Sequence, residues 1–301
     1  MPPSLYTQQS KNVWRTWLLM SIFFVIVIAL GWIFAYTYDD VSILYIAVFI
    51  ALVMNIFSYW YSDKIALKTS GAKQITKEQY PDYWNAIENL CITAGLPMPR
   101  LYVIQDPAPN AFATGRNKEH AAIAATSGLL AMMNKSELEG VLAHELSHIG
   151  NRDILLSTIV VVLVGFIALL ANFFIRLRLF GGGGRRNDGG LGIIFLIVGI
   201  VFAILSPIAA TLIQLAISRK REYLADASGA LLTRYPEGLA SALEKIGNYN
   251  QPMIHPNNAT AHLFISNPFG PHKDKMSGLS RLFMTHPPIQ DRINALLGTK
   301  A

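Results

Sequence analysis

The chain of 301 residues is 52% hydrophobic and only 15% charged, with a mean hydropathy of +0.36. Its single cysteine, Cys91, excludes an internal disulfide framework and any cysteine-rich zinc module. The formal net charge of +6 does not indicate nucleic-acid binding, because the basic residues lie beside apolar segments, where they set membrane orientation. We therefore expect a membrane protein, built as one domain with additions, and no nucleic-acid partner.

Four apolar stretches are long enough to cross a bilayer, whose hydrocarbon core of about 30 Å needs roughly 20 helical residues. The first follows basic residues, like a signal peptide, but the second begins after only "TYDD", which favours a retained hairpin. The alternative for the last two is a pair of buried core helices, which their length and near absence of charge disfavour. The stretches are Trp17–Tyr36, Val41–Trp60, Ile154–Ile175 and Leu191–Leu215.

The charges around these spans predict their direction. Lys11 and Arg15 precede the first span, whereas the turn to the second carries Asp39 and Asp40 and no cation. This places the N-terminus and the soluble segments in the cytoplasm. The loop 176–190, "RLRLFGGGGRRNDGG", disagrees, because its four arginines would then lie outside. Either the charge rule is overridden there or the last two spans do not cross fully.

The spans divide the chain into four parts. An N-terminal hairpin (1–60) precedes a first soluble part (61–153), and a second hairpin (154–215) precedes a second soluble part (216–301). The first soluble part has mixed helix and strand patterns. The second is mainly helical, with a Pro-, Asn- and His-rich irregular loop at 250–280.

Capping and strand signals place the elements of the soluble parts. Thr76 and Gln79 form a capping box ahead of a helix that Gly95 can end. Two short strands are expected, "RLYVI" (100–104) and "HAAIAAT" (120–126), with an irregular loop between them. Further helices are expected at 218–234, 236–247 and 287–297.

A second capping box, Ser136 with Glu139, opens a helix that carries "HELSH". Positions i and i+4 share a helix face, so His144 and His148 offer two imidazole nitrogens to one point. Zinc is bound in this way, with bonds of about 2.0–2.1 Å. Glu145 points beside such an ion, where it can take a proton from water. The alternative is a chance histidine pair on a surface helix.

A catalytic zinc site needs a third protein ligand. The strongest candidate is Glu222, because the even number of crossings after His148 returns the chain to the same side of the membrane. Asp226 lies one turn further on and can hydrogen-bond a histidine ligand. The alternative for Glu222 is a solvated ion pair with Arg219 or Lys220. Other candidates are His120, His255, His262, His272 and His286.

Four motifs set among four spans carry a family resemblance: "HELSHIGNRD", "REYLAD", "NAFATG" (110–115) and "THPP…DR" (285–292). The chain resembles the HtpX membrane metalloproteases, relatives of the CAAX prenyl endopeptidases within the gluzincin group, over essentially its whole length. The resemblance implies a mainly α integral membrane protein. Four transmembrane helices would accompany a cytoplasmic α+β zincin-like catalytic domain with a small sheet.

The resemblance also implies an activity. It is that of a zinc-dependent endopeptidase with one Zn²⁺ per chain, in a bacterial inner membrane, with its site facing the cytoplasm. Its partners would be the lipid bilayer and polypeptide substrates, namely misfolded membrane proteins handled in quality control. The oligomeric state stays open.

By motif, the resemblance assigns His144, His148 and Glu222 to zinc, Glu145 to the role of catalytic base and acid, and Asp226 to support of a histidine ligand.

A second group of residues is assigned less directly. His286 and Arg292 match an element of the family in which a cation or donor steadies the oxyanion of the tetrahedral intermediate. Asn110 matches a motif near the active site, and the strand 121–126, with Ala124, is a candidate edge for pairing with an extended substrate. The alternatives are that His286 only caps a turn and that Asn110 only supports a loop.

Two rival functions can be weighed. A membrane metal transporter would place ionisable groups inside the spans, and here they lie at or beyond the span ends. A structural zinc site would need four closed ligands and no general base. The intact Glu145 also argues against a catalytically inactive relative.

Overall fold

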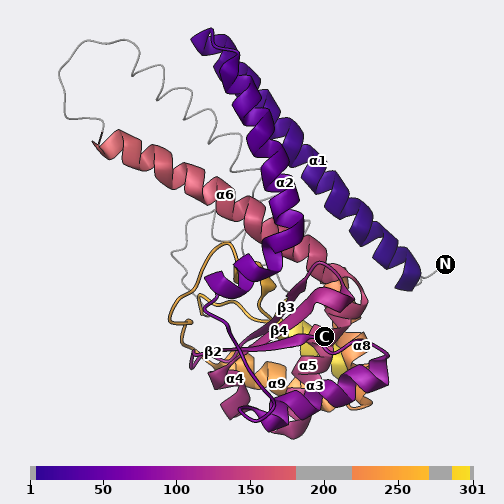
Figure 1. The fold of residues 1–301 in the computed structure, drawn as a ribbon. Helices are drawn as coiled ribbons and strands as arrows, with labels where there is room; N and C mark the ends of the chain where they lie inside the picture. The colour runs from indigo at the N-terminus through magenta and orange to yellow at the C-terminus, as the bar shows by residue number, and fades with distance from the viewer. Residues whose placement is uncertain (1–4, 181–218, 271–286, 299–301) are drawn as a thin grey trace.

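A computed structural model describes residues 5–180, 219–270 and 287–298. Its first two helices, α1 (Leu5–Tyr38) and α2 (Ser42–Thr69), form an antiparallel hairpin that projects from the rest of the molecule (Figure 1). The helices touch closely at Gly31, where a Cβ atom would fall 2.2 Å from the Cβ of Ala47. Small residues at such contacts are typical of helices that pack inside a membrane.

Two described helices are long and apolar enough to cross a bilayer: α1 over Asn12–Tyr36, and the whole of α2. The third predicted span coincides with α6 (Asp153–Phe180). The first part of α6, Asp153–Phe166, and α5 (Lys135–Gly150) are together long and apolar enough for a third crossing as one broken span, bent by 85°. The fourth, 191–215, lies outside the described residues. The described chain thus supports the N-terminal hairpin, and four crossings stay a prediction.

A four-stranded sheet lies beside the inner end of α2 (Figure 1). In spatial order the strands are β1 (Lys73–Gln74), β2 (Arg100–Ile104), β4 (Ala121–Thr126) and β3 (Ala111–Gly115). β2 pairs antiparallel with β1 and parallel with β4, and β4 pairs antiparallel with β3. This order makes β4 an interior strand and leaves β3 at one edge.

Both faces of the sheet are buried. Side chains alternate between the two faces along each strand, so neighbouring residues belong to different cores. Ile123 on β4 belongs to the core that includes Leu142 of α5. The neighbouring Ala124, with Phe112 of β3, belongs to a second core that includes Leu163 of α6 and residues of α1. The sheet therefore separates the helices of the soluble part from the inner ends of the membrane helices.

The remaining helices surround α5, which packs against α3, α8, α9 and β3. Burial of α5 is nearly complete from Gly140 to Ser147. The helices are α3 (Pro81–Ala94), α4 (Ser127–Met132), α8 (Arg219–Thr233), α9 (Pro236–Asn248) and α11 (Ile289–Leu297), with 3-10 turns at Lys118–His120 and Ala261–Leu263.

Several local predictions are confirmed and three are wrong. Thr76 and Gln79 do not cap α3, which begins at Pro81 after Tyr80. The strands at 100–104 and 121–126 are present, and Gly95 ends α3 in the left-handed region with φ of 63°. The expected loop between the strands contains β3 instead. The capping box of α5 is Asn134 with Glu137, two residues before the predicted pair Ser136 and Glu139. Asn is as good an N-cap as Ser, so both registers matched the pattern.

Candidate metal centre

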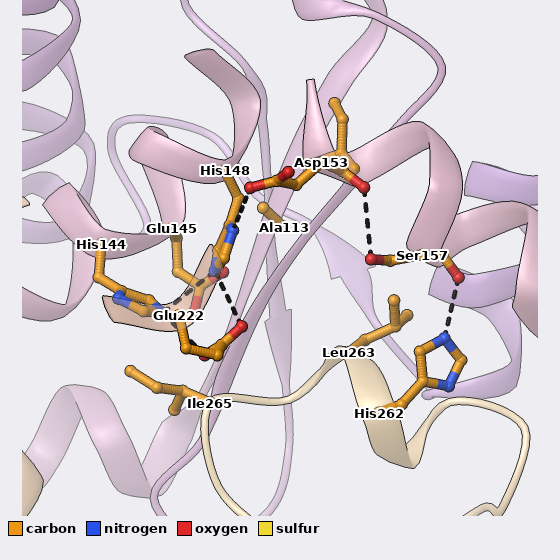
Figure 2. Close-up of a pocket in the computed structure, with 11 residues that line it drawn as sticks. Ala113, His144, Glu145, His148, Asp153, Ser157, Glu222, His262, Leu263 and Ile265 are labelled. Carbon is orange, nitrogen blue, oxygen red and sulfur yellow. Dashed lines mark hydrogen bonds and ion pairs between the residues drawn. The ribbon is translucent and has the colours of Figure 1, made fainter. Parts of the chain in front are cut away.

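The two histidines of α5 face α8, and the backbones of the two helices approach each other closely there. Gly229 of α8 makes this possible, because a Cβ atom there would lie 2.9 Å from the backbone nitrogen of His144. Seven residues earlier, two turns along α8, Glu222 reaches the side chains of His144 and His148 (Figure 2). His144 and Glu222 are buried, and His148 is the more accessible of the histidines.

The donor atoms of these three residues are spaced for a single ion. The Nε2 atoms of His144 and His148 lie 3.2 Å apart, and they lie 3.8 and 3.7 Å from the carboxylate oxygens of Glu222. Donors around a tetrahedral ion with bonds of about 2.05 Å lie about 3.3 Å apart. The three residues therefore fit one tetrahedral metal ion and leave its fourth position to another ligand.

The hydrogen bonds behind the histidines also call for a cation. The Nδ1 atom of His144 lies 2.8 Å from Asp226, and that of His148 lies 3.1 Å from Asp153. Carboxylates only accept hydrogen bonds, so each Nδ1 carries a hydrogen, and each Nε2 faces the point between the two rings. When both rings are neutral, their Nε2 lone pairs can bind one metal ion at that point.

The field at the site favours positive charge. Burial alone would lower the pKa of His148. The hydrogen bond to Asp153 and the charges of Glu222, Asp153 and Glu145 outweigh burial and raise the pKa of His148 to about 9. The negative surroundings that hold a proton here are those that attract a cation.

Asp226 is held by Arg292 as well as by His144. Its Oδ2 and Oδ1 accept hydrogen bonds of 2.9 and 2.7 Å from Nε and Nη2 of Arg292, and Oδ1 is also the atom that contacts His144. Burial alone would raise the pKa of Asp226, but the hydrogen bonds and charge of Arg292, with those of His144, lower it to about 2. Asp226 is therefore a carboxylate at neutral pH, and it fixes both the tautomer and the orientation of the His144 ring.

Asp153, which the sequence analysis did not single out, does the same for His148. Its other oxygen accepts a 2.5 Å hydrogen bond from the amide of Asn12 on α1, and Nε of Arg221 lies 3.8 Å from it. Arg221 also donates to Asn12 at 3.2 Å. All of these groups are buried except His148, which is partly so. The first membrane helix is thus joined to the metal centre through polar groups.

Glu145 lines the same small pocket as the three donors (Figure 2). Edge strand β3 contributes Ala113 to its wall. At the other end lies His262, whose Nε2 donates to the backbone oxygen of Ser157 at 2.9 Å. The pocket thus combines a candidate metal site, a carboxylate beside it and a strand edge.

Comparison with known proteins decides the family. The sequence model of the family described as Peptidase family M48 matches residues 77–300. The chain belongs to peptidase family M48. Curated proteins named Protease HtpX homolog match it over 97% of its length. The one from Caldanaerobacter subterraneus subsp. tengcongensis is 48% identical and covered over 97% of its own length. The one from Streptococcus gordonii is 42% identical and covered over 99%.

The family match and these relatives show that the chain is an HtpX-type M48 membrane metalloprotease. Among solved structures, the crystal structure of S. mikatae Ste24p matches with a TM-score of 0.48 and 19% identity, covering 97% of this chain and 66% of that one.

Arg292 of this M48 peptidase lies outside the metal pocket and bonds to Asp226. Its side chain is fully buried, donates to Asp226 and to the backbone oxygen of Ile265, and does not line the pocket. In the structure the guanidinium group of Arg292 therefore holds Asp226, the partner of His144. Its contact with an oxyanion stays a prediction.

Neither predicted substrate-binding residue of this M48 peptidase lies in the pocket. The side-chain amide of Asn110 donates to the backbone oxygen of Ser266 at 3.0 Å, so it supports a loop. Ala124 is fully buried on interior strand β4, so 121–126 cannot be a free edge. The edge next to the pocket is β3 instead. His286 lies outside the described residues.

Replacing Asp153 with Asn is expected to weaken metal binding by about 10- to 100-fold. An amide cannot accept from both His148 and Asn12, because one of its two polar atoms is a donor. Competition with a chromophoric chelator measures the affinity. The control is Asp63→Asn, which removes a buried carboxylate paired with Arg100 at 2.6 Å, outside the metal pocket. Equal losses in both variants would contradict the role of Asp153.

Proposed function

We propose that this M48 membrane protease is a zinc-dependent endopeptidase that holds one Zn²⁺ per chain between His144, His148 and Glu222. One observation carries the proposal: three donors are spaced for a single tetrahedral ion, with Glu145 beside them in the same pocket. When bound there, zinc would supply Lewis-acid polarisation of the scissile carbonyl and activation of a water molecule.

The residues of the chain divide the remaining work. Glu145 takes a proton from the attacking water and delivers it to the departing amine nitrogen, so that the two steps balance. Asp226 and Asp153 hold the imidazoles of His144 and His148, and both carboxylates stay in place through their own partners. Rigid ligands keep the reacting groups in position.

The substrate is proposed to bind as an extended segment along β3. Ala113 of edge strand β3 lines the pocket, between Ala111, whose oxygen accepts from the backbone nitrogen of Ile265, and Gly115, whose nitrogen donates to Thr158. The backbone of Ala113 is therefore the part of the edge proposed to pair with the substrate. This pairing requires no particular sequence, which suits an enzyme that acts on unfolded chains. The joint between the site and α1 supports substrates that emerge from the membrane, such as misfolded membrane proteins.

We further propose that the site faces the cytoplasm of a bacterial cell, at the inner membrane. Lys11 and Arg15, ahead of the apolar span in α1, against Asp39 and Asp40 in the turn to α2, support this orientation. Asn12, one residue after the first of these cations, lies at the same end of α1 as the metal centre.

Removing the metal is expected to abolish cleavage. The full chain in detergent should contain about one zinc per chain and cut a fluorogenic unfolded polypeptide. A strong chelator should reduce the rate by more than about 100-fold, and one equivalent of Zn²⁺ should restore it. Metal content and cleavage rate are measured on the same samples. Full cleavage by metal-free protein would contradict the proposal, and so would zinc binding without any cleavage, which is the outcome for a metal carrier.

A further inference from the structure

A second cavity, of about 420 Å³, opens where α2 leaves its apolar stretch. Trp60, Tyr61 and Lys64 of α2 form one wall. Arg100 at the start of β2, and Arg116 and His120 from the segment between β3 and β4, form the other. None of these residues belongs to the metal centre or its supports. The cavity combines aromatic rings with several cationic groups.

Aromatic side chains place this cavity at the level of the lipid headgroups. Trp17 of α1 stacks on Tyr59 of α2 with ring centroids 6.1 Å apart, so the two helices carry aromatic rings at one height. Trp14, Trp17 and Trp60 are each at least half exposed, and Tyr61 is also exposed. Exposed Trp and Tyr at the end of an apolar helix mark the boundary between membrane and water.

The two guanidinium groups at the cavity are already held in place. Arg116 stacks over the Trp60 ring at 4.4 Å and donates to Nε2 of His120 at 2.8 Å. Arg100 donates to Asp63 at 2.6 Å. Each guanidinium group has five N–H donors, so both keep donors for a ligand. Groups that are fixed beforehand lose little entropy when they bind.

The charge balance at the cavity leaves two cations for a ligand. Arg100 neutralises Asp63, and Glu119 on the rim lies 4.0 Å from Lys118. Within the described part of the chain, no ion pair with a carboxylate is found for Lys64 or Arg116. Both can therefore meet an anion, and the planar fork of arginine matches the oxygens of a phosphate.

We propose that this cavity binds the phosphodiester of an anionic phospholipid headgroup, with Arg116 and Lys64 as its charged contacts. The aromatic wall favours a lipid over free phosphate. Trp60 is exposed at membrane height, and Met98, which also lines the cavity, adds exposed apolar surface that acyl chains can cover. Binding of the soluble part to the membrane surface would then depend on the content of anionic lipid.

Quenching of tryptophan fluorescence by lipids with brominated acyl chains tests the proposal on the full chain in nonionic detergent. Phosphatidylglycerol should quench saturably, and phosphatidylcholine should bind at least about fivefold more weakly. Trp60→Phe should remove the saturable part. Arg116→Gln and Lys64→Gln should each weaken phosphatidylglycerol binding about fivefold, the effect of one cation at a membrane surface.

Lys68→Gln is the matched control, because it removes one cation one helical turn after Lys64 on α2 but does not line the cavity. It should change the affinity by less than twofold. Arg116→Lys, which keeps the charge but loses the fork, should give an intermediate loss in a chain with an unchanged unfolding temperature. Equal binding of the two lipids, an equal loss in Lys68→Gln, or displacement by millimolar inorganic phosphate would each overturn the proposal.

Discussion

Changing Glu145 to Gln is expected to lower kcat for peptide hydrolysis by a factor of about 10²–10⁴, with the metal retained. Gln has nearly the shape of Glu but cannot take a proton from water. Glu145 lies in the metal pocket without being one of the three grouped donors, so its loss should not release the ion. The measurements are cleavage of an unfolded polypeptide, metal content and the unfolding temperature.

Glu139→Gln provides the control, because Glu139 lies on the same helix and outside the pocket. It should cleave at close to the wild-type rate. If Glu145→Gln holds its metal and cleaves at the wild-type rate, the proposed base is wrong. If it loses its metal, Glu145 contributes to binding the ion, and the division of roles between α5 and α8 must be redrawn.

The parts of the site set by local periodicity could be predicted from the sequence. His144 and His148 share a face of α5 because they are one helical turn apart, and the structure places their Nε2 atoms 3.2 Å apart. Glu222 required one more step, the return of the chain after a hairpin, and it lies with them. Both inferences depend on regular helices, which apolar patterns report well.

Asp153 could not be placed in this way. On a continuous helix it would lie five residues beyond His148 and point to a different face. The chain instead breaks at Arg152, whose φ of 57° is left-handed, and α6 leaves α5 at 85°. This turn brings Asp153 back to Nδ1 of His148. The signals were its place at the end of the motif "HELSHIGNRD" and at the start of an apolar helix, and an acidic residue is also ordinary at a helix start.

The edge strand was misplaced because strand order is a long-range property. The sequence around Ala124 is typical of any buried strand. Its interior position follows from pairing with both β2 and β3, and the β3 segment resembled a loop because of the Pro and Asn residues before it. Contact of β3 with the pocket through Ala113 then depends on the packing of the sheet on α5.

The ion pair behind His144 leads to a second large effect. Asp226→Ala is expected to destabilise the fold by about 3–5 kcal/mol, because the fully buried guanidinium of Arg292 then loses its hydrogen-bonded carboxylate partner. The same change should weaken metal binding about 10- to 100-fold, because the His144 ring loses its acceptor. Chemical unfolding of the metal-free protein and chelator competition measure the two effects separately.

The double variant Asp226→Leu with Arg292→Met separates the two roles. Removing both charges leaves no unpaired ion, and replacing a buried pair with apolar side chains is often neutral or stabilising, so most of the lost stability should return. Metal affinity should stay low, because Leu cannot accept a hydrogen bond from Nδ1 of His144. If affinity returned together with stability, Asp226 would serve only the fold. A stable double variant that binds metal weakly would instead assign to Asp226 the orientation of a metal ligand.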